Sequence, residues 1–286
     1  MICIKAAAAH SDLYFSMIRR KPKGSHPSSA ATQTLHAYRA WDASTRWFHW
    51  VNAILVAAML VLGVAMLTGR WFGVGDEGRH QLQSIHVALG AALTLNLLWR
   101  CYWAFRGGRS AQWRAILPGG PGYWKDLRAY LSAFVAGHPR YYIGHNPLAR
   151  LGVTVLFILL AAQIVSGLIL VGIDLFAPPP GQPLSGATSS FPNPTPPLPW
   201  AIAWSAEDAQ ALRASLHAVH FYGFYLLVIA VIQHVVAVII TEVREGGDLV
   251  SAMLTGRKSL PGRPEDEGSA DAPRPDKRRR HRRISS

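Results

Sequence analysis

The stretch LHAVHFYGFYLLVIAVIQHVVAVIIT, residues 216–241, decides which fold this sequence can adopt. It contains no proline and no Asp, Glu, Lys or Arg, and it exceeds the roughly 20 apolar residues that a helix needs to cross a bilayer. Such a segment spans as a helix, because hydrocarbon offers the backbone no other hydrogen-bond partner. Three histidines, His217, His220 and His234, interrupt its apolar character. An ionisable residue inside a span indicates function, because its burial is costly without a partner.

Three further stretches have the same apolar, proline-free character. With 216–241, they give four spans at about 50–67, 84–105, 151–172 and 216–241. The sequence therefore predicts an all-α membrane protein, a bundle of four transmembrane helices embedded in a lipid bilayer.

The composition supports this prediction. Of 286 residues, 50% are hydrophobic and only 16% are charged, against about 25% charged in an average soluble domain. The 29 Lys and Arg outnumber the 16 Asp and Glu. Nucleic-acid binding would explain the basic charge but not the apolar content, so no nucleic-acid partner is expected. Two cysteines and the absence of a Cys-x-x-Cys-His motif exclude a disulfide framework and covalent c-type haem.

The basic residues indicate the orientation in the membrane. Between the second and third spans, residues 106–150 carry seven Lys or Arg and one Asp, and the flanks of the first and fourth spans are also basic. Because Lys and Arg are retained on the cytoplasmic side, we expect both termini in the cytoplasm.

The remaining segments have little apolar patterning. Residues 1–37 are expected to form a disordered extension, 38–260 the membrane domain, and 261–286 a disordered basic tail. Between the last two spans, residues 177–199 are rich in Pro, Gly and Ser and predict no regular structure, whereas 200–212 predict a short surface helix.

The histidines in the spans fall at matched depths. His220 and His234 are 14 residues apart, so they share a helix face and lie about 21 Å apart along the axis. A single metal ion cannot bind both. His49 begins the first span on the cytoplasmic side, at the level of His234, and His86 begins the second span at the outer level of His220.

Two pairs of imidazoles on different helices follow from this topology. Neither pair has a carboxylate or thiol beside it, and zinc sites usually require four ligands. Two facing imidazoles instead suit the axial positions of a haem iron. We therefore expect two b haems about 20 Å apart, one between His49 and His234 and one between His86 and His220.

Small residues are expected where a flat porphyrin passes between helices. Gly63, Gly90 and Gly223 stand at suitable positions on the histidine-bearing faces. The alternative, that these glycines serve ordinary helix packing, stays open because glycine is common at transmembrane helix interfaces.

Two other polar residues lie at the haem levels. Arg100, 14 residues after His86, either pairs with a haem propionate or extends to lipid headgroups. His217 lies about 100° off the face of His234, so it is a weaker ligand candidate that could bind a propionate or lie at a partner surface. The histidines outside the spans, including His145, are expected to be solvated or hydrogen-bonded.

Several motifs in this order resemble one known family. They are RWFHW (46–50), His86-x-x-x-Gly90, YIGHNPLAR (142–150), His217-x-x-His220 with His234, and TEVREGGDLVSAMLTGRKSL (241–260). Over roughly residues 38–260 the chain resembles the bacterial cytochrome b561 and nickel–iron hydrogenase b-type cytochrome family. The N-terminal extension, the Pro-rich segment and the basic tail have no counterpart in the family pattern.

The resemblance implies a helical bundle with two b haems and the same four axial ligands, His49, His86, His220 and His234. It implies an electron-transfer protein, or an oxidoreductase subunit, rather than an enzyme on its own. Its partners would be quinone and a periplasmic redox protein such as a hydrogenase, a dehydrogenase or cytochrome c.

We expect a quinone site near the haem on the cytoplasmic side, with Arg46 and Glu242 as candidate residues. Three alternatives remain open. One is a free-standing oxidoreductase that acts on a small molecule such as superoxide, another is a membrane anchor for a soluble oxidoreductase, and the third is a histidine-lined proton or metal transporter without haem.

Overall fold

Four long helices dominate the computed structural model, which describes residues 35–138, 140–176, 206–246 and 248–267. They are α2 (Ala43–Thr68), α3 (Asp76–Arg106), α6 (Pro147–Phe176) and α7 (Ala206–Glu245). Each is long and apolar enough to cross a membrane, which confirms the four predicted spans. The expectations for residues 1–34, for the Pro-rich segment 177–199 and for residues 268–286 lie outside the described residues.

One helix differs from the prediction. Residues 200–212 were expected to form a separate surface helix, but α7 begins at Ala206 and continues without a break to Glu245. The expectation of a separate helix is wrong because no Gly or Pro between Ala206 and Leu216 interrupts the helix.

Shorter elements cover one end of the bundle. They are β1 (His36–Arg39), the 3-10 turn η1 (Arg109–Ala111), α4 (Trp113–Ile116), α5 (Tyr123–Val135), α8 (Leu249–Thr255) and β2 (Arg257–Leu260). The described structure thus starts at Leu35, three residues before the expected domain boundary at residue 38, and continues past residue 260 to Glu267.

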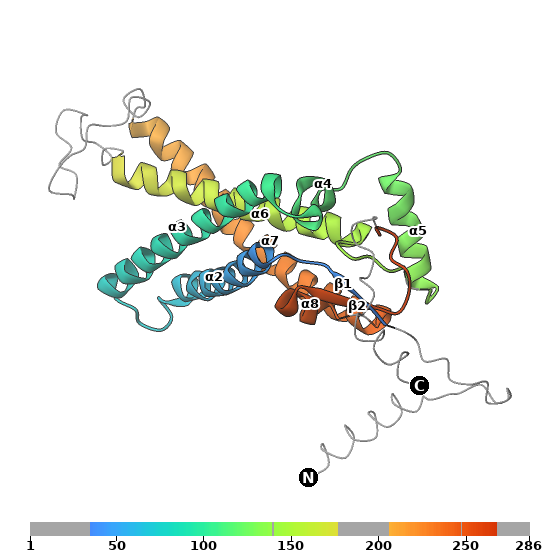
Figure 1. The fold of residues 1–286 in the computed structure, drawn as a ribbon. Helices are drawn as coiled ribbons and strands as arrows, with labels where there is room; N and C mark the ends of the chain where they lie inside the picture. Colours follow the sequence, from blue (N-terminus) through green and yellow to red (C-terminus); the bar gives the residue numbers. More distant parts are fainter. Residues whose placement is uncertain (1–34, 139, 177–205, 247, 268–286) are drawn as a thin grey trace, which may run out of the picture. The chain divides into compact units, whose positions relative to one another are not determined.

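The long helices pack as two antiparallel pairs. In Figure 1, α2 runs alongside α3, and α6 runs alongside α7, and contacts of α3 with α6 and of α2 with α7 join the pairs. We call the end of the bundle that carries His49 and His234 the inner end, and the end that carries His86 and His220 the outer end.

An apolar core layer joins all four helices at mid-depth. Each helix contributes one buried residue to it: Val56, Leu93, Leu160 and Leu227. Three of these residues stand seven positions, about 10 Å along the axis, from predicted haem ligands. They are Val56 after His49, Leu93 after His86, and Leu227 between His220 and His234. The core layer therefore separates the two histidine levels.

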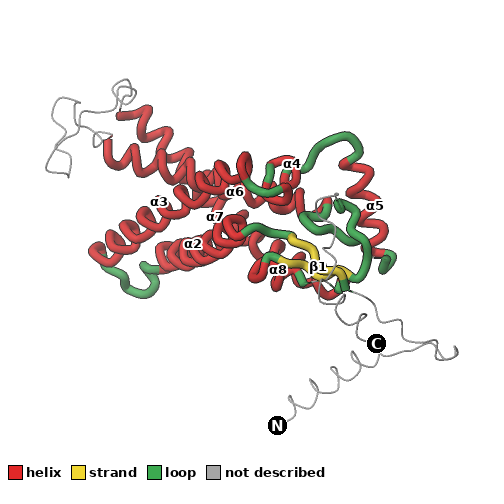
Figure 2. Tube along the Cα trace, viewed as in Figure 1, coloured by secondary structure: helices red, strands yellow, loops and turns green. Residues whose placement is uncertain are grey.

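A small antiparallel ribbon of β1 and β2 lies at the inner end. His36 pairs with Leu260 and Arg39 with Arg257, and Figure 2 shows the ribbon beside α8. The start of α2 is fastened nearby, because Trp50 Nε1 donates to the carbonyl of Met253 at 3.0 Å and Arg46 Nη1 donates to that of Leu254. Strands of four residues have too little pattern to predict from sequence.

Asp42 fixes the first turn of α2 against α3. Its carboxylate accepts a hydrogen bond from the backbone N–H of Thr45 at 2.7 Å and from Trp103 Nε1 at 3.1 Å. Burial by itself raises the pKa of Asp42, but hydrogen bonds from Thr45, Trp103 and the Gly108 backbone outweigh it and hold the pKa below its ordinary value.

Replacing this cap should destabilise the bundle. We expect Asp42→Ala to lower the free energy of unfolding by about 1–2 kcal/mol, because a helix cap is lost. Because the folded-state pKa is depressed, this stabilisation is present above the unfolded pKa of about 4 and is lost as pH falls through the folded value. Denaturant unfolding of the purified protein in detergent measures both effects.

The matched control is Asp76→Ala at the start of α3, whose side chain is 83% exposed. That change should stay within about 0.5 kcal/mol of the parent protein. Equal losses for the two variants would contradict the role given to Asp42.

Candidate functional site

The two imidazoles at the outer end face each other across the bundle. His86 of α3 and His220 of α7 have ring centroids 6.0 Å apart, with their planes at 69°. A ring nitrogen lies about 1 Å from its ring centre and about 2 Å from a metal that it binds. Two axial imidazoles on one metal therefore have centres about 6 Å apart, and the observed spacing fits a haem iron between them.

The second nitrogen of His220 has a partner that sets its tautomer. Ser166 Oγ, which is 2% exposed, donates to the carbonyl of Ala162 at 2.7 Å and lies 3.0 Å from His220 Nδ1. A hydroxyl that donates to the Ala162 carbonyl favours the tautomer in which Nδ1–H donates to Oγ and Nε2 keeps its lone pair. This is the form that binds a metal, and such outer partners orient ligating histidines.

A glycine makes room for this imidazole. A Cβ at Gly167 would lie 3.2 Å from His220 Cε1, which is closer than side chains normally approach. The sequence reasoning missed Ser166 and Gly167, because small residues on a span give no signal until their neighbour is known.

The inner pair of histidines is carried by α2 and α7. His49 of α2 and His234 of α7 are close enough to interact electrostatically, and no ring stacking joins them in the described part of the chain. The His49 ring contacts the neighbouring Trp50, with centroids 5.3 Å apart. The structure thus brings His86 and His220 into ring contact, whereas the pairing of His49 with His234 stays a prediction.

Unpartnered polar atoms gather at the inner end. Among the described residues, eight buried side-chain nitrogen or oxygen atoms have no hydrogen-bond partner. Six are at the inner end, on Thr45, Arg46, His49, Asn52, Arg100 and His145, and the other two, on His86 and Gln163, are at the outer level. Because buried polar groups normally find partners, the inner end has the chemistry to hold polar ligands.

Arg100 is one of these residues. Its side chain is 3% exposed, its Nη2 donates to the carbonyl of Ala111 at 2.9 Å, and its guanidinium lies 5.7 Å from the ring centre of Phe48. The alternative that Arg100 extends to lipid headgroups is therefore wrong, because protein surrounds the guanidinium. Its Nη1 has no partner among the described residues, which fits the carboxylate of a haem propionate.

His145 lies in the loop before α6, at the inner end, and its Nδ1 is neither solvated nor hydrogen-bonded among the described residues, which corrects the sequence-based expectation. Its ring meets that of Trp41 edge-on, with centroids 4.8 Å apart, and its Nδ1 is buried. Burial, and then the charges of Arg100 and Arg150, lower the pKa of His145 to about 3. His145 is therefore neutral at pH 7 and can exchange hydrogen bonds with a neutral ligand. Its place in the YIGHNPLAR motif was the signal that could have found it.

The predicted slot glycines have different surroundings. A Cβ at Gly63 would lie 2.8 Å from the Phe224 ring, and one at Gly223 would lie 2.8 Å from the Gln163 amide. At Gly90 the nearest side-chain atom would be 3.8 Å away. Gly63 and Gly223 thus permit close packing in this structure, and their role beside a haem stays a prediction.

The three remaining candidates are placed as follows. His217 is exposed and stacks on Phe221 with ring centroids 6.3 Å apart. Arg46 lies against the end of α8 with its Nε buried. Glu242 is half-buried on α7, about 12 Å along the axis from His234.

The fold and the histidine pairs define a class, a multi-pass membrane protein of the b-type cytochrome kind. Residues 40–256 match the family model described as prokaryotic cytochrome b561, and the chain belongs to this family. The family is one of haem b proteins, so the residues and the cofactor agree.

Several similar proteins are named as Ni/Fe-hydrogenase B-type cytochrome subunits. The chain is 29% identical to the probable Ni/Fe-hydrogenase B-type cytochrome subunit of Rhodobacter capsulatus, over 77% of this chain and 80% of that protein. It is 30% identical to the subunit of the same name from Azotobacter chroococcum mcd 1, over 77% and 88%. It is 26% identical to the probable Ni/Fe-hydrogenase 1 B-type cytochrome subunit of Escherichia coli K12, over 78% and 91%. No solved structure matches the chain significantly.

Removing one histidine of each pair tests the pairing. We expect His220→Ala to remove the outer haem and His234→Ala the inner one, because each change takes away one axial ligand. Pyridine haemochrome assay of the purified variants should then give about half of the parent haem content. Redox titration should show that a different component is lost in each.

The control for this experiment is His217→Ala, three residues from His220 on the same helix, which should keep both haems. Loss of both haems in His234→Ala, with the helical circular dichroism unchanged, would contradict two separate sites.

Ser166 offers a finer test of the outer site. Ser166→Ala removes the acceptor of His220 Nδ1–H and should shift the midpoint potential of the outer haem while the inner haem keeps its potential. Thr154→Val is the control, because Thr154 lies on the same helix and its hydroxyl donates only to the carbonyl of Arg150. Equal shifts of both haems in Ser166→Ala would contradict the local role of the hydroxyl.

Proposed function

We propose that this chain is a di-haem cytochrome b that carries electrons between a redox partner at the outer end and the quinone pool at the inner end. The observation that carries the proposal is the 6.0 Å spacing of the His86 and His220 rings. Haem b, when bound, supplies reversible one-electron chemistry, and the protein supplies ligation and a low-dielectric environment.

Different residues would bind the two haems. His86 and His220 would be the axial ligands at the outer end, with Ser166 fixing the His220 tautomer. His49 and His234 would be the ligands at the inner end, and the unpartnered Nη1 of Arg100 would bind a propionate there. The 6.0 Å spacing of the His86 and His220 rings and the unpartnered Nη1 of Arg100 support this part of the proposal.

A quinone site at the inner end is supported by its polar side chains. The neutral His145 has an unpartnered ring nitrogen, and Arg46 has an unpartnered Nε. Both can hydrogen-bond a quinone oxygen. Glu242 stays a candidate from sequence for the same site.

The redox partner is proposed from the relatives. Several are named as Ni/Fe-hydrogenase cytochrome subunits, so we infer that a hydrogenase is the partner of this chain, ahead of a dehydrogenase or cytochrome c. The basic flanks of the spans support cytoplasmic termini in a bacterial inner membrane, which puts the outer end and the partner in the periplasm. A haem-free transporter is disfavoured by membership in a cytochrome family.

Reduced-minus-oxidised spectroscopy of the purified protein tests whether it binds two b haems. We expect a b-type α band and two haems per chain, and two redox components in a titration. One haem per chain in fully loaded protein would overturn the di-haem function.

The quinone site has its own test. Arg46→Gln combined with Glu242→Gln should slow haem reduction by quinol at least tenfold, because two polar contacts to the quinone are removed, each worth about 1 kcal/mol or more. Stopped-flow absorbance with a soluble quinol measures this rate, and dithionite should still reduce both haems.

The control is Arg70→Gln, because Arg70 is an exposed arginine in the turn between α2 and α3 at the outer end. An unchanged rate in the double variant, with both haems present, would rule out the quinone site at these residues.

A further inference from the structure

Helix α5 crosses the inner ends of two spans. Tyr123 OH donates to the carbonyl of Pro147, the first residue of α6, at 2.8 Å. Tyr130 OH donates at 2.9 Å to Glu245, the last residue of α7. These contacts are about 10 Å apart on α5, yet both partners stand where a span ends. Helix α5 therefore runs along the plane of the span ends, and Figure 1 shows it crossing the direction of α6.

Two faces of α5 are apolar, and only one of them is covered by protein. Tyr123, Leu127 and Tyr130 are buried against the bundle. Trp124, Leu131 and Val135 are 63%, 38% and 80% exposed. At 100° per residue, these three side chains fall within about 40° of each other and form a second stripe beside the buried face.

Basic residues border this exposed stripe. Lys125 and Arg128 are exposed and follow next around the helix, on the side away from the buried face. The order around α5 is thus protein contact, exposed apolar stripe, and then positive charge. This order is typical of a helix that lies in a membrane interface.

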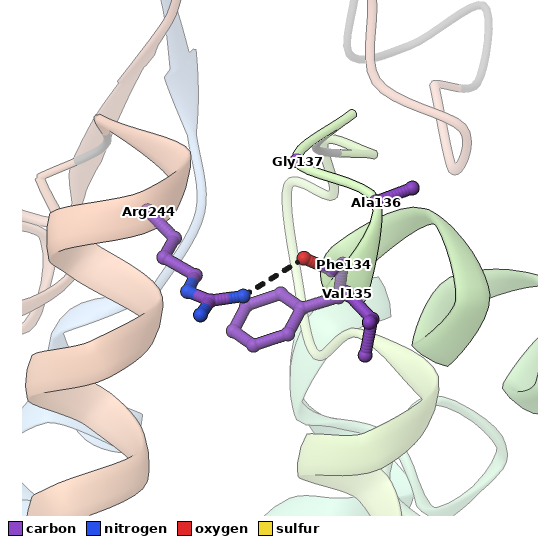
Figure 3. A pocket seen from close by; sticks show the side chains of 5 residues that line it. All are labelled: Phe134, Val135, Ala136, Gly137 and Arg244. Carbon is purple, nitrogen blue, oxygen red and sulfur yellow. Dashed lines mark hydrogen bonds between the residues drawn. The ribbon is translucent and has the colours of Figure 1, made fainter.

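A pocket continues the stripe at the C-terminal end of α5. It measures about 300 Å³ and is lined by Phe134–Gly137 and by Arg244 of α7. In Figure 3 the Arg244 guanidinium reaches across to α5, where it donates to the carbonyl of Phe134 at 2.9 Å. The pocket therefore has an apolar wall next to a positive charge.

We propose that α5 is an interfacial helix that binds the anionic phospholipid surface around the inner end. Trp124, Leu131 and Val135 would enter the boundary of the acyl chains, and Lys125, Arg128 and Arg244 would lie at phosphate groups. Continuity favours lipid over a protein partner, because α5 lies at the depth where the spans leave the bilayer. Charge complementarity favours anionic lipid, because residues 106–150 carry seven basic residues and one acidic residue.

The depth of α5 is the first thing to measure. Full-length protein with Cys3 and Cys101 replaced by serine is spin-labelled at Leu131→Cys and, in a second sample, at Asp126→Cys on the far side of α5. In nanodiscs, the label at 131 should be relaxed more by oxygen than by a water-soluble nickel chelate, and the label at 126 should show the reverse. Greater nickel accessibility at 131 would overturn the proposal.

The preference for anionic lipid is the second measurement. A bimane label at position 131 is exposed to brominated phosphatidylglycerol or brominated phosphatidylcholine at equal mole fraction. The phosphatidylglycerol should quench more strongly, and Lys125→Gln with Arg128→Gln should bring the ratio close to one, because both charges that attract the anionic lipid are removed. Equal quenching by both lipids in the parent protein would overturn the anionic preference.

The matched control removes two basic residues from the outer end, as Arg70→Gln with Arg79→Gln, and should leave the quenching ratio unchanged. A fall equal to that of the α5 variant would assign the preference to net charge rather than to α5. The α-helical circular dichroism of every variant is compared with that of the parent protein, so that misfolding is distinguished from loss of lipid binding.

Discussion

The structure depends on one constraint, that a polar side chain inside a hydrocarbon layer needs a partner. At the outer end this requirement is nearly met by protein alone, because Ser166 binds one nitrogen of His220 and leaves the other for a ligand. At the inner end it is not, because six buried polar atoms lack partners among the described residues. The two ends therefore differ chemically. Under the proposed function, the two rings of the outer end would hold one haem iron, and the inner end would also hold groups with several hydrogen-bonding oxygens.

The core layer keeps these two chemistries apart. Val56, Leu93, Leu160 and Leu227 are all apolar and each is less than 10% exposed. The layer lies about 10 Å along the helix axis from either histidine level. None of its four residues carries a charge. Because the same α7 carries His220, Leu227 and His234 at intervals of seven residues, one helix sets the separation of the two sites.

Sequence predicts the features that depend on one helix at a time. Hydropathy locates the four spans, and the spacing of His220 and His234 gives two levels without any knowledge of packing. The inner end is different, because its contacts join distant segments. Arg46 donates to Leu254, 208 residues away in the sequence, and β1 pairs with β2, although all four spans lie between them in the sequence. His145 lies outside the spans, so its burial against Trp41 could not be inferred from hydropathy.

Buried polar contacts also fix the cover of the inner end in one arrangement. Lys258 of β2 is 2% exposed and donates to the carbonyl of Tyr142 at 2.8 Å, and Glu245 is 4% exposed and accepts from Tyr130. Burial lowers the pKa of Lys258, and the nearby charge of Glu245 partly offsets this. A buried charge left without its partner is strongly unfavourable, so sliding β2 or α5 out of place is opposed.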